Sequence, residues 1–303
     1  MKTRIYLFAI ITLLCISCKD KKTNAIQTKS NLIAIDTTIQ KVAENALHNQ
    51  LEALNANAGI VVVMDAKTGT VKAIANKNIS ENDTIETASL STVPCMIVAL
   101  DDSVISPDDK IDTGNGVLKY KGVTITDYNS NRGGFGKVTA EQVVTLSSNV
   151  GAAKIILKGY ENNPDKLIDG LHQLGFTDIS KDNPVADFLL LGYGIKMPVI
   201  QIMKFYNSIA NGTVKCSPAT LKAIKKMLAD AVIAGTGSPA KSDKITIAGK
   251  TGSLNDTALF CGYFPVDNPQ YSGIVVIQNP KNGNLSGGFM AGNVFKEIAE
   301  AIY

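Results

Sequence analysis

Residues 59–65 read Gly-Ile-Val-Val-Val-Met-Asp, a run of β-branched residues that ends at a turn. The turn is Ala-Lys-Thr-Gly at residues 66–69, and residues 70–75 form a second segment of strand length. Two such runs on either side of a short polar turn are typical of a β-hairpin. We therefore expect an antiparallel pair of strands near the start of the folded region.

The rest of the chain surrounds this hairpin with helical patterns and, toward its end, with further strands. Apolar residues recur at helical spacing over residues 36–54, and Asp36-Thr37 is suited to cap that helix. Further helices are expected at residues 89–101, 140–146, 149–158, 164–174, 198–210, 218–233 and 291–302, and further strands at 244–248, 258–264 and 273–278. This order predicts an α+β fold, with a central antiparallel β-sheet built from both chain ends, a helical block inserted between, and helices packed on the sheet.

Composition indicates a globular protein of one large or two modest domains and argues against several functions. The 303 residues are 45% hydrophobic and 19% charged, and the formal net charge is +3. Such a balance is not that of a basic nucleic-acid-binding domain, so we expect no nucleic-acid partner. His48 and His172 are the only histidines, which leaves little room for a zinc site or a Ser-His-Asp triad. We expect neither a metal ion nor a cofactor.

The 5 cysteines fall into two groups by position. Cys95, Cys216 and Cys261 are scattered and form no Cys-x-x-Cys pair, and we interpret them as buried free thiols. One disulfide with one free thiol is the alternative, because an exported chain permits disulfides. Cys15 and Cys18 lie close together near the N-terminus.

The N-terminus has the organisation of an export signal. Lys2 and Arg4 precede an apolar run at residues 5–14, which is too short to span a membrane, and a polar segment starts at Lys19. A small residue followed by a cysteine at the end of such a run resembles a bacterial lipoprotein cleavage site. The resemblance implies cleavage before Cys18, whose thiol would carry lipid.

This interpretation divides the chain into three parts. We expect residues 1–17 to be a lipoprotein signal peptide, residues 18–35 a flexible polar tether, and residues 36–303 the folded domain. One departure is Cys15, which stands where the lipoprotein pattern usually has leucine. An uncleaved membrane anchor and a plain secreted protein are the alternatives. The expected location is the bacterial cell envelope, on the membrane and facing outside the cytoplasm.

Two short motifs point to chemistry. Lys250-Thr251-Gly252-Ser253 follows one predicted strand and precedes another, and Ser147-Ser148-Asn149 lies at a predicted helix junction. A Lys-Thr-Gly on a strand with a Ser-x-Asn upstream on a helical block is two thirds of a serine acyltransferase signature. Each tripeptide alone is weak, whereas their order and settings together favour that chemistry. The structural alternatives are an exposed strand end for the first motif and a helix cap for the second.

The chain resembles the transpeptidase domain of penicillin-binding proteins along nearly all of residues 36–303. Besides the two motifs, the resemblance includes residues 60–69, residues 200–212 and Gly262-Tyr263-Phe264-Pro265. Arg132-Gly133-Gly134 is similar to a loop that this family places near its cleft. The resemblance implies a peptidoglycan stem peptide or a β-lactam as the partner molecule.

The resemblance also implies that Ser89 is the nucleophile, at the start of a buried helix shortly after the hairpin. The family has Ser-x-x-Lys there, with its lysine three residues after the serine. In this chain the residue three positions after Ser89 is Thr92. A lysine one helical turn away removes the serine proton, and threonine cannot act as a base near neutral pH. Because loss of a general base lowers a rate by about 10²–10⁴, we expect impaired acyl transfer. A literal Ser-x-x-Lys at residues 238–241 is interpreted as a turn.

The remaining roles follow from the same resemblance. Lys250 would supply charge for a substrate or β-lactam carboxylate, and the hydroxyls of Thr251 and Ser253 would hydrogen-bond that carboxylate. The backbone N–H groups of Ser89 and Ser253 would form the oxyanion hole. Asn149 would hold the amide side chain of the substrate. None of these roles needs a lysine at the position of the missing base.

Three hypotheses for function follow. The first is a penicillin-binding-protein transpeptidase-like lipoprotein that binds penicillin or cell-wall stem peptide and is catalytically impaired at Thr92. The second is an active D,D-transpeptidase or carboxypeptidase in peptidoglycan synthesis that uses Ser89 and needs another base, for which Lys250 acting through Ser147 is one candidate. The third, ranked last, is a β-lactam sensor, which needs acylation but no turnover. The sequence does not identify a protein partner.

Overall fold

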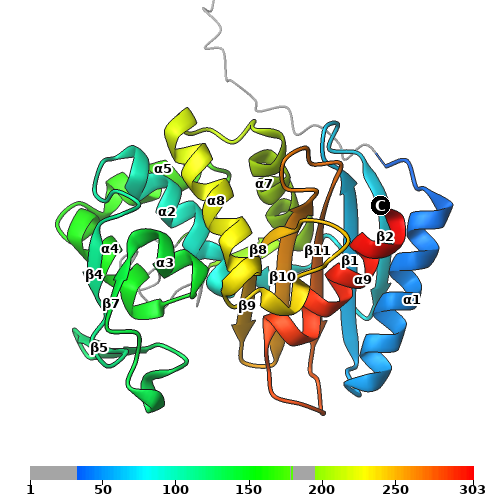
Figure 1. The fold of residues 1–303 in the computed structure, drawn as a ribbon, viewed down its shortest axis with the longest axis horizontal. Helices are drawn as coiled ribbons and strands as arrows, with labels where there is room; N and C mark the ends of the chain where they lie inside the picture. The colour runs from blue at the N-terminus through cyan, green and yellow to red at the C-terminus, as the bar shows by residue number, and fades with distance from the viewer. Residues whose placement is uncertain (1–32, 178, 180–194) are drawn as a thin grey trace, which may run out of the picture. The chain divides into compact units, whose positions relative to one another are not determined.

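The computed structural model describes residues 33–177, 179 and 195–303 (Figure 1). The predictions for residues 1–17 and for lipid on Cys18 lie outside these residues, as does most of the predicted tether. No helix in the described part of the chain combines the length and the apolar character that a membrane span requires.

An antiparallel sheet with the strand order β2-β1-β11-β10-β9 forms the centre of the domain. β1 (Ala58–Asp65) and β2 (Val71–Lys77) are the predicted hairpin. β1 also pairs with β11 (Tyr271–Gln278). β11 pairs in turn with β10 (Thr257–Phe264), and β10 with the edge strand β9 (Ala248–Leu254). The prediction of an α+β fold whose sheet is built from both chain ends is therefore confirmed.

Helices cover both faces of this sheet (Figure 1). α1 (Thr37–Ala53) and α9 (Asn293–Ile302) pack on one face and share a core with Val61 of β1. The neighbouring residue Ile60 points to the other face and joins the core under the helical block. Because side chains alternate along a strand, one β-branched run supplies both cores.

The helical block matches the predicted helices closely. It consists of α2 (Thr92–Asp101), α3 (Ala140–Thr145), α4 (Asn149–Tyr160), α5 (Pro164–Gln173), α7 (Val199–Asn211) and α8 (Pro218–Ala234). Nearby residues determine where these helices begin. Thr139 and Gln142 form a capping box at the start of α3, and Pro218 occupies the first turn of α8. Pro94 likewise lies in the first turn of α2.

The prediction of a strand over residues 244–248 is wrong. The strand there is β9, and it contains Lys250-Thr251-Gly252-Ser253 instead of preceding it. Ile245 and Ile247 are apolar because they are buried in a core, not because they pair in the sheet. The motif itself pairs along its length with β10. Pairing with a neighbouring strand thus outweighs the low strand propensity of glycine and lysine.

Short strand pairs flank the helical block, and the sequence analysis does not predict them. They are β3 (Thr84–Glu86) with β8 (Lys196–Pro198), β4 (Lys110–Asp112) with β7 (Lys137–Thr139), and β5 (Val117–Tyr120) with β6 (Val123–Thr126). Strands of this length give no detectable alternation of apolar and polar residues.

The described cysteines are free thiols. Cys95 and Cys261 are buried, as expected, and burial raises the pKa of the Cys95 thiol to about 12. Cys216 is only half-buried, which corrects the expectation for that residue, because it lies in the loop between α7 and α8 and packs against a core from outside.

Candidate active site

A cavity of about 900 Å³ brings together residues that lie far apart in the sequence. Ser89, Ser147, Asn149, Thr251 and Ser253 all line it. They come from three places: the 3₁₀ turn before α2, the junction between α3 and α4, and the edge strand β9. The arrangement places a hydroxyl on each of these elements at one surface.

Ser89 lies in η1 (Ala88–Ser91), a 3₁₀ turn that leads directly into α2. The turn is held from several sides. The Tyr206 hydroxyl donates a hydrogen bond of 3.0 Å to the Leu90 carbonyl, and a Cβ added at Gly252 would lie 3.3 Å from the Ala88 Cβ. Ala88 has a left-handed φ of 47°, an uncommon conformation that its surroundings must enforce. The close contact with β9 brings Ser89 next to the strand that carries Ser253.

The junction that carries Ser147 and Asn149 is fixed by a buried carboxylate. Asp127 accepts hydrogen bonds of 3.0 Å from the Ser148 hydroxyl and 2.9 Å from the Val150 N–H. Burial raises the pKa of the Asp127 carboxyl. The Asn149 amide donates to the Thr126 carbonyl at 2.7 Å. The sequence analysis does not predict a role for Asp127, although it holds the Ser-x-Asn motif in place.

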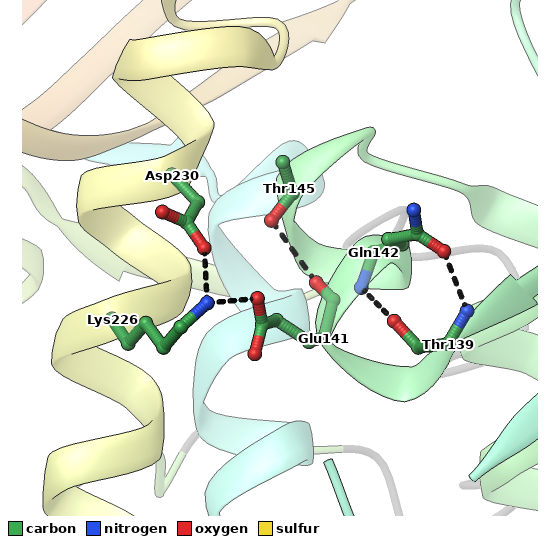
Figure 2. Close-up of polar contacts among 6 residues, drawn as sticks. All are labelled: Thr139, Glu141, Gln142, Thr145, Lys226 and Asp230. Atoms are coloured by element: carbon green, nitrogen blue, oxygen red, sulfur yellow. Dashed lines mark hydrogen bonds and ion pairs between the residues drawn. The ribbon is translucent and has the colours of Figure 1, made fainter. Parts of the chain in front are cut away.

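Polar contacts with α8 hold α3, the helix that leads into this junction (Figure 2). The Lys226 amine of α8 contacts the Glu141 carboxylate of α3 and donates to Asp230 at 2.6 Å. These two hydrogen bonds raise the pKa of Lys226 to about 12. At the end of α3, the Thr145 carbonyl accepts from the Thr236 N–H at 3.3 Å. The helix that ends just before Ser147 is therefore tied to both α8 and the turn that follows it.

Lys250 is completely buried behind the cavity wall. Its amine donates hydrogen bonds of 2.7 Å to the Ser147 hydroxyl and 3.0 Å to the Thr251 carbonyl. Burial disfavours the charged ammonium and lowers the pKa of Lys250 to about 7. A substantial fraction of this lysine is therefore neutral near neutral pH, and its contact with the cavity runs through Ser147.

Thr92 is the first residue of α2, one turn after Ser89, and is 3% exposed. Its N–H donates to the Ser89 carbonyl, which confirms that the two residues lie one helical turn apart. Among the described residues, no lysine amine lies within hydrogen-bond distance of the Ser89 hydroxyl. The literal Ser-x-x-Lys is confirmed as a turn, because Ser238 starts the short 3₁₀ segment η3 (Ser238–Ala240) and Lys241 is exposed.

Several wall residues escape the sequence analysis. The Thr236 and Thr251 hydroxyls lie 2.7 Å apart in a hydrogen bond, and the Gly287 N–H donates to the Ser253 hydroxyl at 2.8 Å. A Cβ on Gly287 would lie 2.4 Å from the Gly252 carbonyl, so glycine is required there. In the sequence, Thr236 lies within Gly235-Thr236-Gly237, and Gly287 begins the pair Gly287-Gly288. Such glycine-rich stretches predict turns, but they do not indicate which strand the turn packs against.

The comparisons with known proteins agree with this geometry. Residues 59–300 match the family model described as the penicillin binding protein transpeptidase domain. The chain is 24% identical over 332 residues to the probable peptidoglycan D,D-transpeptidase PenA of Neisseria flavescens, with 88% of this chain and 80% of that protein covered. It is 22% identical over 333 residues to PenA of Neisseria gonorrhoeae, with 89% of this chain but 56% of that protein covered.

Solved structures give the same result. The apo structure of the TP domain of Burkholderia pseudomallei penicillin-binding protein 3 is similar with a TM-score of 0.79 and 26% identity. The similarity covers 88% of this chain and 94% of that chain. Since the family model spans both halves of the sheet and the helical block between them, the chain belongs to the penicillin-binding protein transpeptidase domain family.

Proposed function

We propose that this domain binds penicillins and peptidoglycan stem peptides in the Ser89 cavity but acylates Ser89 slowly. The observation that carries the proposal is the contrast between the two halves of the site. Ser89, Ser147 and Ser253 line one cavity, whereas the position one turn after Ser89 holds a buried threonine. A serine hydroxyl is a poor nucleophile until a neighbouring base takes its proton.

The binding half of the proposal needs only groups that are present. The hydroxyls of Thr251 and Ser253, on the edge strand, would hydrogen-bond the carboxylate of the ligand. Asn149 would hold the amide of its side chain, and the N–H groups of Ser89 and Ser253 would receive the oxyanion. Recognition can therefore persist without efficient turnover.

The second candidate is a slow D,D-transpeptidase or carboxypeptidase, and the Lys250–Ser147 contact favours it. In this mechanism the Ser89 proton moves to the Ser147 oxygen while the Ser147 proton moves to the Lys250 amine. The Ser89 oxygen then attacks the amide carbon, the C–N bond breaks, and the leaving amine takes the proton back. The 2.7 Å hydrogen bond and the pKa of about 7 for Lys250 suit such a relay.

Labelling with a fluorescent penicillin separates these candidates. The full chain, purified in detergent, is incubated with the penicillin, and the adduct is followed by gel fluorescence and intact mass. We expect slow labelling that Ser89→Ala abolishes and that Thr92→Lys accelerates by about 10²–10⁴. Rapid labelling of the unaltered chain would refute impairment, and loss of the residual labelling in Lys250→Met would favour the relay.

The proposal includes attachment to the membrane of the cell envelope through lipid on Cys18. This part is supported by the sequence of the N-terminal segment, which resembles a bacterial lipoprotein signal. In a bacterial expression host fed with labelled palmitate, the chain should incorporate label. Cys18→Ala should lose the label, whereas the matched variant Cys15→Ala should keep it. Equal incorporation by both variants would contradict lipidation at Cys18.

A further inference from the structure

We propose that Arg132 forms an anion subsite in the cavity and selects ligands that carry a carboxylate in addition to the one received at β9. The inference rests on the proposed function, because it adds one contact to the same ligand. It gives a role to the Arg-Gly-Gly loop, which the geometry of acyl transfer leaves without one.

The charge distribution of the cavity wall is the first argument. Within the part of the chain that the structure describes, Arg132 is the one wall residue with a formal charge. Among the ion pairs of the described residues, none involves the Arg132 guanidinium. The nearby Asp127 carboxylate is buried and directed at the start of α4. A guanidinium presents a planar set of donors that fits a carboxylate, so the open partner is an anion in the cavity.

The second argument is that the loop holding Arg132 is built rigidly. Arg132 ends the short 3₁₀ segment η2 (Ser130–Arg132), and its N–H donates to the Asn129 carbonyl at 2.8 Å. Gly134 has a φ of 71°, and a Cβ there would lie 2.3 Å from the backbone carbon of Asn115. The loop is thus pressed against its neighbour. Because the backbone that carries Arg132 is fixed before binding, only its exposed side chain has to become ordered on a ligand.

The third argument is that Arg132 and the two hydroxyls of β9, from Thr251 and Ser253, lie on different parts of the cavity wall. Thr251 and Ser253 belong to β9 of the sheet, whereas Arg132 ends η2 in the loop between β6 and β7, so the two sets approach a ligand from different elements. A ligand that uses both must carry two carboxylates. A stem peptide does so, because its terminal carboxylate is accompanied by the free carboxylate of γ-linked D-glutamate and, in some peptides, by that of a diamino diacid.

Matched peptides provide the test. The four test peptides are pentapeptides that contain γ-D-glutamate and diaminopimelate and end in D-Ala-D-Ala. Each of these two internal residues has one free carboxylate, and the four peptides cover the combinations in which either, both or neither of these carboxylates is amidated. Equilibrium binding to the full chain is measured by calorimetry, together with Arg132→Gln and the control Lys137→Gln, which removes an exposed lysine of β7 outside the cavity wall. We expect amidation of one internal carboxylate to weaken binding about 3- to 10-fold.

The two variants decide the assignment. In Arg132→Gln the preference for the free carboxylate should vanish, whereas Lys137→Gln should retain it. A preference that survives in Arg132→Gln, or no preference in the unaltered chain, overturns the subsite and leaves the proposed function intact. Failure of every peptide and of penicillin to bind the unaltered chain overturns the proposed function, and the subsite with it.

Discussion

Replacing Lys250 by methionine should change how the stability of the protein depends on pH. The pKa of Lys250 is lowered to about 7 in the folded state by burial, against about 10.4 for an unfolded lysine. Between these values the unfolded chain binds one proton more than the folded chain. The free energy of unfolding must therefore rise with pH in this window, by up to about 1.4 kcal/mol per pH unit. The destabilisation is complete below the folded pKa and disappears above the unfolded one.

Urea denaturation at about pH 7.5, 8.5 and 9.5 measures this dependence. Between the first and last conditions, the unfolding free energy of the unaltered chain should rise by about 2–3 kcal/mol relative to Lys250→Met. The hydrogen bonds that methionine cannot make contribute a constant offset, which the comparison removes. Lys226→Met is the control, because the raised pKa of Lys226 keeps it protonated in both states across this window. Parallel pH profiles for the unaltered chain and Lys250→Met would show that Lys250 stays charged, and would refute the relay.

Three further substitutions test the frame around the site. Asp127→Asn should lower the free energy of unfolding by about 1–3 kcal/mol in urea, because an amide NH₂ would face the buried donors at the start of α4. Gly235→Ala should lower it by about 1–3 kcal/mol in thermal unfolding, because its Cβ would lie 2.1 Å from the Thr145 carbonyl. Tyr206→Phe should cost about 1 kcal/mol and increase hydrogen exchange in η1, because the buried Leu90 carbonyl loses its donor.

The main elements of the fold were predictable because their signals are local. The β-branched run of β1 lies entirely within one strand, and α1 begins at a cap whose side chain bonds to the backbone two and three residues away. The boundary of β9 was not predictable in this way. Its residues include glycine and lysine, and they form a strand because β10 supplies a partner at every position. The pairing partner is encoded elsewhere in the chain.

The two short motifs and the family resemblance predicted which residues form the site, but not the contacts between them. Ser147 and Lys250 are 103 residues apart in the sequence, and nothing in their spacing indicates a 2.7 Å hydrogen bond. Asp127 gave no signal of its role, because it acts on a buried junction whose donors lie 21 and 23 residues further along the chain. For Arg132 the family resemblance indicated a loop near the cleft, but not the tight packing of that loop against Asn115. A single sequence contains these residues but not the register that brings them together.

The placement of the site's groups explains how binding and catalysis can separate. The proposed binding groups come from β9 and from the α3–α4 junction. Asp127 and Lys226 support that junction without any contribution from position 92. A change from lysine to threonine at that position would remove a base and leave those contacts in place.

The reverse change, Thr92→Lys, is informative because it would restore a base without altering those contacts. An amine at the buried Thr92 position would be desolvated as Lys250 is, so its pKa would be lowered and it could accept a proton. The labelling rate of Thr92→Lys should therefore rise with pH as the new amine becomes neutral, and a rate that is independent of pH would mean that the gain arises from something other than a restored base.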